Sequence, residues 1–320
     1  MKKRKLILAA GLALSLSCVS PQASVLAAEA TAMPAAVQMT APEDARAKLE
    51  KAYASLIDFN QGDLTFDLDF STPLASGGYE GKFVFNADPY FGAKGTCKME
   101  LEVPGAPTHN INMAFYVRES KDLISTYYQD TNGNWLKKIT QKKAGGEKLG
   151  KTMDNAFDQD LMSVTKSVQL GERNGNEQSY LVTTDGTKLY QYLTKIMDIK
   201  TTGKAANRDT LNQLFANLGD VTYTITINEK RHELTDFHVN LTAQARNAAT
   251  AYIKSLKQKP EEEKQLLDII NNSTLEINFH GQGYGEPQDV TIPAEVLAGA
   301  KEDKSGSNSI FFPVINDMQK

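Results

Sequence analysis

Alternation of apolar and polar side chains over residues 63–71 is the feature that most narrows the fold of this chain. Leu64, Phe66, Leu68 and Phe70 alternate with aspartate, threonine and serine, which gives the segment one apolar and one acidic face. A period of two is typical of a β-strand that buries one face and exposes the other. The pattern therefore predicts a half-buried strand of an antiparallel sheet.

Further short segments with turn residues between them continue this pattern and predict a meander of six strands. The next five cover residues 79–86, 94–103, 110–118, 123–129 and 134–140. Asn132 and Gly133, between the last two, strongly favour a tight hairpin turn. Later strands are expected at 178–184, 221–227, 237–243 and 275–283. The strands 221–227 and 237–243 should pair as a hairpin, and the strand 275–283 should end the sheet.

Helical spacing separates these groups of strands. An amphipathic helix is expected at 41–58, after the capping-box residues Thr40 and Glu43. A second helix is predicted by Met153, Phe157, Leu161, Val164 and Val168. Two more helices are expected between Asp185, which is predicted to be a helix N-cap, and Leu218. Another two are expected between residues 245 and 271, with the break between them at Pro260. The fold class is thus α+β: one strongly curved antiparallel sheet of about ten strands, covered on one face by helices.

The N-terminus has the composition of a bacterial secretion signal. Four cationic residues at positions 2–5 precede an apolar stretch at 6–16 that is too short to span a membrane. Small residues favour cleavage near Ala27 or Ala28, which gives a signal peptide of 1–28 and a secreted, extracytoplasmic protein. Cys18 offers an alternative, because a lipoprotein peptidase would cut before it and leave a lipidated cysteine at the membrane.

The rest of the chain divides into three predicted parts. Residues 29–40 are rich in Ala, Thr and Pro without periodicity and form a flexible leader. No linker interrupts the strands that follow, so residues 41–300 are expected to fold as a single domain. The C-terminal tail, 301–320, contains an apolar cluster at 310–315, which either docks on the body or binds a partner.

Charge and cysteine content exclude some classes of function. The formal net charge of −4 and the pI of about 5.7 give no basic surface for nucleic acid. Cys18 leaves with the signal or carries lipid, so Cys97 has no partner for an intrachain disulfide. Cys97 occupies an apolar position of a strand and is expected to be a buried, unreactive thiol.

No group of residues has the spacing of a catalytic or metal site. The four histidines, including His238 and His280 on neighbouring strands, lack metal-ligand spacing. Asp130 begins an imperfect calcium-loop pattern that a hairpin turn explains better. Asp67 and Asp69 form a carboxylate pair that regular alternation explains as a solvated face. We therefore expect a protein with no catalytic residues, no metal and no cofactor.

Large apolar side chains on one face of the predicted sheet are the remaining candidates for a binding site. They are Phe66, Phe70, Phe83, Phe85, Met99, Leu101, Met113, Phe115 and Phe237. Such residues form either an ordinary core beneath the helices or the lining of an apolar cavity between sheet and helices. Both interpretations stay open at this point.

The order of elements resembles the LolA/LppX-type lipoprotein-carrier superfamily. The resemblance rests on the signal, the first helix, the meander with its turn at 132–135, the covering helices, the late hairpin and the closing segment 285–296, which contains Ile292, Pro293, Ala294, Glu295 and Val296. It covers residues 41 to 300 and implies a half-barrel of about eleven strands with a helical lid.

This resemblance implies binding without bond chemistry. Characterised members of the superfamily hold acyl chains of lipids or lipoproteins in an apolar cavity, so the expected partner is a lipid or an acylated protein. Membrane association through Cys18 and a monomeric state are further expectations. The alternative is a cell-surface scaffold or interaction module of the same fold, with a filled core and no ligand.

Overall fold

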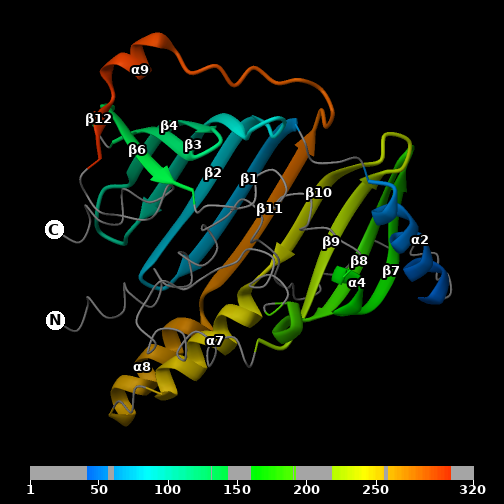
Figure 1. Ribbon diagram of the computed structural model, residues 1–320. Coiled ribbons are helices and arrows are strands. Elements are labelled where there is room, and N and C mark those ends of the chain that lie inside the picture. The colour runs from blue at the N-terminus through cyan, green and yellow to red at the C-terminus, as the bar shows by residue number, and fades with distance from the viewer. Residues whose placement is uncertain are drawn as a thin grey trace.

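The computed structural model describes residues 42–56, 61–130, 132–142, 160–189, 191, 218–255 and 259–303. Their central element is one large, curved and unclosed sheet of twelve strands (Figure 1). The signal, Cys18, the leader and the apolar cluster at 310–315 lie outside the described residues, as do most residues of the helices predicted between 153 and 218.

The first half of the sheet is the predicted six-stranded meander. Its strands are β1 (Gln61–Thr72), β2 (Ala75–Asn86), β3 (Gly92–Glu102), β4 (His109–Glu119), β5 (Leu123–Gln129) and β6 (Trp135–Gln141). Consecutive strands pair antiparallel, as the alternation predicts. At the turn between β5 and β6, Gly133 has a φ of 77°. Asp130 Oδ1 accepts hydrogen bonds from the backbone N of Asn132 and Asn134, which confirms a hairpin turn here.

The second half consists of β7 (Thr165–Asn174), β8 (Glu177–Asp185), β9 (Asp220–Asn228) and β10 (Glu233–Asn240). The predicted pairing of β9 and β10 is confirmed. Two helices follow, α7 (Thr242–Ser255) and α8 (Pro260–Asn271), with Pro260 at the start of the second as predicted. Thr242 already begins α7, so the prediction that the strand continues to residue 243 is wrong.

The late strand β11 (Thr274–Gln282) lies in the middle of the sheet. The strand order is β12-β6-β5-β4-β3-β2-β1-β11-β10-β9-β8-β7, so β11 pairs with β1 on one side and β10 on the other. The expectation that this strand ends the sheet is therefore wrong. Alternation specifies which faces a strand presents but not which strands flank it, because backbone hydrogen bonds have no side-chain signature.

The helix predicted through Leu161, Val164 and Val168 is a second prediction that the structure corrects. Only α4 (Asp160–Ser163) is helical within residues 160–174, and Val168 lies in β7 rather than in the predicted helix. An irregularity between Thr165 and Ser167 shifts the register of β7, so that Thr165 and Val168 are both buried although they are three residues apart. A bulge of this kind imitates helical spacing, which explains the wrong prediction.

Helical cover of a whole face of the sheet is not confirmed. α2 (Pro42–Ala54) packs near β7, where Ala45 and Leu49 are buried, and Arg46 donates hydrogen bonds to the carbonyls of Met162 and Thr165 at 2.7 and 3.0 Å. α7 and α8 stand together at one end of the sheet (Figure 1). Within the described ranges, no helix is long and apolar enough to cross a membrane.

The closing segment, residues 284–303, runs from β11 along the sheet to the far edge of the meander (Figure 1). The Tyr284 ring fits beside Gly62 and Gly281, whose missing Cβ atoms leave room for it. Asn86 exchanges two hydrogen bonds with the backbone of Gln288, and Lys94 pairs with Asp289 at 2.7 Å. The segment ends in α9 (Ala294–Gly299) and β12 (Lys301–Glu302), which pairs parallel to β6.

Glycines opposite aromatic residues are a structural requirement of the meander. A Cβ at Gly95 would lie 2.4 Å from the Lys82 carbonyl oxygen, 2.5 Å from Phe83 Cβ and 2.9 Å from Phe115 Cε1. Gly81 is similar, since its Cβ would lie 2.0 Å from the Phe66 ring. Rings packed over strand glycines restore the contacts that these glycines lack.

Gly95→Ala should lower the free energy of unfolding by about 1–3 kcal/mol, because the new methyl group overlaps backbone and ring atoms. Gly299→Ala is the matched control, since nothing lies within 4 Å of its Cβ position. Urea unfolding of the two variants measures the difference, and equal stability would contradict the packing described.

Candidate functional site

All nine apolar candidates lie on one face of the sheet, which we call the apolar face. Strand register places three of them in one row across six strands: Phe237, Phe279, Phe66, Gly81, Cys97 and Met113 are successive cross-strand neighbours. We call this the Phe66 row. On one side of the Phe66 row, the next row contains Phe83 and Phe115, and the row after that contains Phe85. On the other side, the next row contains Met99, and the row after that contains Phe70 and Leu101.

Aromatic rings form a continuous contact chain across this face. Ring centroids are 5.3 Å apart for Phe66 and Tyr79, and 6.3 Å apart for Phe66 and Phe83. Phe83 is 6.3 Å from both Phe85 and Phe115. These separations are typical of favourable aromatic pairs, so the rings stabilise the face as one unit.

Burial differs between the two ends of the apolar face. Phe83, Phe85 and Phe115 are buried, and Phe85 is fully inaccessible. At the other end Phe70 and Leu101 are only half-buried, and Phe66 and Met99 between the two ends are half-buried beside buried Leu68 and Tyr79. The apolar face therefore has a closed end near Phe85 and a half-exposed end near Phe70 and Leu101.

Several residues of this face were not among the predicted candidates. Tyr79, Gly81, Ile111 and Phe279 lie between or beside the predicted side chains. The alternation of β2 and β4 places Tyr79, Gly81 and Ile111 on the same face as the candidates of those strands. Phe279 required knowledge that β11 pairs with β1, which the sequence did not provide.

Cys97 lies within the Phe66 row, as its apolar strand position predicted. It is 4% exposed. Burial raises the pKa of its thiol to about 11, and a hydrogen bond with Tyr79 opposes part of the shift. The thiol is therefore protonated at neutral pH and is not a nucleophile.

The opposite face of the sheet is polar over β1, β10 and β11, where it carries the acidic and histidine candidates, whereas over β4–β6 it packs Tyr116, Tyr127 and Trp135 against Ile292 and Val296. Asp67 and Asp69 lie on the polar part of this face, and burial together with the Glu80 and Asp69 carboxylates raises the pKa of Asp67. His238 and His280 do not face each other: His280 pairs with Asp236 at 2.8 Å, and His238 contacts Asn278 at 2.5 Å. Across the described part of the chain, no three His, Cys, Asp or Glu side chains are placed to hold a metal ion.

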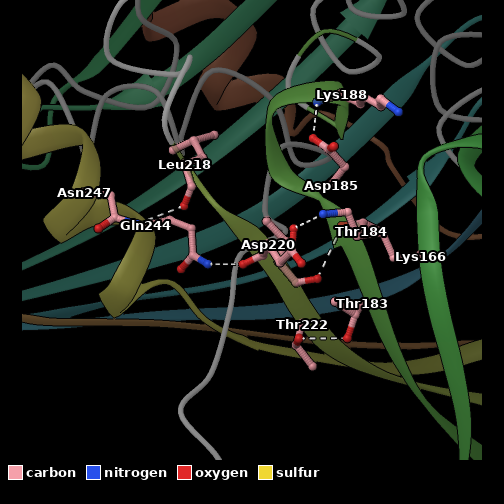
Figure 2. A network of polar contacts seen from close by, with 11 residues as sticks. Lys166, Thr183, Thr184, Asp185, Lys188, Leu218, Asp220, Thr222, Gln244 and Asn247 are labelled. Carbon is pink, nitrogen blue, oxygen red and sulfur yellow. Dashed lines mark hydrogen bonds and ion pairs between the residues drawn. The ribbon is translucent and has the colours of Figure 1, made fainter.

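A polar network joins the ends of β7, β8 and β9 to α7 (Figure 2). Lys166 pairs with Asp220, while the Gln244 and Asn247 amides donate to the carbonyls of Asp220 and Leu218. Asp185 Oδ1 accepts from the backbone N of Lys188 at 3.0 Å, which confirms its predicted role as a helix N-cap. These groups bind backbone or each other, so the network is structural.

The geometry defines an α+β protein built on one unclosed, mostly antiparallel sheet with an extended apolar face. No family model and no curated protein matches the chain.

Several solved structures are similar to it, including the following two. LprF from Mycobacterium bovis has 9% identity and a TM-score of 0.38, covering 78% of this chain and 97% of LprF. A Vibrio parahaemolyticus domain described as an outer membrane lipoprotein-sorting protein has 7% identity and a TM-score of 0.22, covering 78% of this chain and 95% of the domain.

At TM-scores of 0.38 and 0.22, these likenesses support no conclusion about this chain. The function proposed below rests on the geometry of the sheet alone.

Cys97 should react with a thiol reagent only when the protein unfolds, because its thiol is both buried and protonated. The test is the rate of reaction with Ellman's reagent on a chain that starts at Glu29 and lacks Cys18. Reaction at the rate of the denatured chain would contradict the burial described.

Ionisation of the same thiol should also lower stability at alkaline pH. The pKa is raised from 9.0 to about 11 in the folded state, so the unfolded chain loses this proton first and stability falls between these values. Comparison of urea unfolding with Cys97→Ala isolates the effect: the stability difference between the two proteins should change with pH above 9 and stay constant below it.

Proposed function

We propose that this chain is an exported, non-enzymatic protein that binds the acyl chain of a lipid or of an acylated protein against its apolar face. The observation that carries the proposal is the continuity of that face over β10, β11 and β1–β4. From the Phe70 row to the Phe85 row, β11 and β1–β4 contribute only apolar, glycine and tyrosine side chains to it, apart from His109 at the margin, and β10 adds Phe237 and Val239.

Burial of an acyl chain requires no catalytic group. Each CH₂ that leaves water contributes about 0.8 kcal/mol, so an extended apolar surface binds such a chain through area alone. The nine candidates would supply this surface, and the half-exposed end near Phe70 and Leu101 is where a chain would enter. Selection among lipids would then depend on the headgroup and not on the face itself.

The expected cellular setting follows from the sequence. A signal at 1–28 would place the single binding domain, 41–300, outside the cytoplasm. Cleavage near Ala27 or Ala28 would produce a diffusible monomer, whereas processing at Cys18 would produce one that is tethered to the membrane. Lipid and acylated proteins are available as partners in both settings.

A packed scaffold without ligand is the second candidate function. Its support is the close fit of the Phe66 ring over Gly81, together with the contacts of that ring with Tyr79 and Phe83. Rings that already fill the space above the strands leave less surface for a ligand, and the fold would then serve as an interaction module.

Native mass spectrometry of the mature protein, before and after organic extraction, separates the two candidates. We expect a lipid-sized adduct that extraction removes, and Met113→Trp should abolish the adduct because the larger indole occupies the β4 end of the Phe66 row. Asn112→Trp is the matched control, since Asn112 is exposed on the opposite face of the same strand.

Two outcomes would count against lipid binding. One is the absence of any adduct combined with failure of an acyl probe to bind. The other is loss of the fold in Met113→Trp, measured by circular dichroism, which would support the packed scaffold.

A further inference from the structure

Two neighbouring hairpin tips at one end of the sheet expose apolar side chains. Leu74, between β1 and β2, is 46% exposed, and Val103, at the end of β3, is 37% exposed. Pro104, Ala106 and Pro107 are exposed beside Val103. No Asp, Glu, Lys or Arg occurs from position 70 to 79 or from 103 to 117, so both tips are uncharged.

Local hydrogen bonds hold both tips in defined conformations. Thr72 Oγ1 accepts from the backbone N of Leu74 and Ala75 at 3.2 and 3.0 Å and donates to the Ala75 carbonyl at 2.9 Å. In the second tip the backbone N of Ala106 donates to the Val103 carbonyl at 2.9 Å, and Gly105 has a φ of 81°. Pro104 and Gly105 suit the central positions of a type II turn. Preorganised tips lose little entropy when they bind a surface.

The tips continue the half-exposed end of the apolar face. Phe70, Gly77 and Leu101 are cross-strand neighbours in the last row before the turns, and Phe70 and Leu101 are half-buried. Exposed Leu74 and Val103 therefore stand beside the point where the apolar face is open. Exposed apolar side chains gathered at one end of the sheet mark a contact surface more strongly than singly scattered ones do.

Charges around the tips favour a neutral partner. Glu100 and Glu102 lie on the polar side of β3, where Lys98 pairs with Glu100 at 3.5 Å and Ser76 contacts Glu102 at 3.4 Å. This local excess of acid disfavours an anionic lipid surface, which attracts clusters of Lys and Arg. An uncharged, apolar tip suits insertion into the interface of a zwitterionic bilayer.

We propose that the tips 72–75 and 103–107 dock on a zwitterionic lipid bilayer and bring the open end of the apolar face against it. The inference rests on the proposed function in one respect, namely that an acyl chain passes between the bilayer and the apolar face at this contact. The contact itself depends only on the tips, so the two proposals can fail separately.

Flotation with phosphatidylcholine vesicles tests the docking. The mature chain from Glu29 is used, because lipid on Cys18 would itself bind vesicles. We expect the wild-type chain to float and Leu74→Asp/Val103→Asp to lose about tenfold in partitioning, since two apolar contacts become charged. Leu297→Asp/Ile139→Asp is the matched control, with exposed fractions of 46% and 53% at sites away from the tips.

The outcomes distinguish docking from lipid binding. A tip variant that fails to float but keeps the lipid adduct in native mass spectrometry supports docking and leaves the proposed function intact. Flotation that depends on the tips in a protein that shows no adduct and binds no acyl probe supports docking and overturns the proposed function. Equal flotation of the tip and control variants, no flotation of the wild type, or salt-sensitive preference for phosphatidylglycerol overturns the docking. Binding only to vesicles that contain membrane proteins also overturns it and indicates a protein partner.

Discussion

The pairing of β11 with β1 and β10 is the interaction on which the rest of the structure depends. Its register with β1 runs from Asp63 opposite Gln282 to Ser71 opposite Thr274, and its other edge pairs with β10. Without β11, the meander β1–β6 and the group β7–β10 would be two separate sheets, each with an open edge. The central strand therefore creates a single apolar face from segments that lie far apart in the chain, at the cost in folding rate expected of non-local pairing.

That face combines close packing at one end with partial exposure of apolar side chains at the other. Phenyl rings over Gly81 and Gly95 pack closely, which stabilises the sheet and permits its curvature, since glycines are the positions where strands bend most easily. Towards Phe70 and Leu101 the same face becomes half-exposed. The closed end supplies stability and the open end supplies apolar surface. A binding function requires that the open surface is used by a ligand and not by a further part of the chain.

Sequence patterns predicted much of this arrangement and failed for identifiable reasons. Alternation placed all nine candidate side chains on one face, because a period of two defines the face of each strand. It did not predict the central position of β11, which depends on backbone pairing, or β7, whose register shift imitates helical spacing. The exposed tips at Leu74 and Val103 were also missed, since exposure there depends on how the strands align at the end of the sheet. The fit of Tyr284 beside Gly281 is likewise a contact that spacing does not reveal.

Photo-crosslinking with a diazirine-bearing fatty acid tests the central claim most directly, because it reports which residues contact an acyl chain. Peptide mapping of the crosslinked mature protein should place the label on β1–β4, at side chains of the apolar face such as Met99 and Met113, and excess unlabelled fatty acid should remove it. Labelling confined to the polar face, or unaffected by competition, would contradict the claim that the apolar face binds acyl chains.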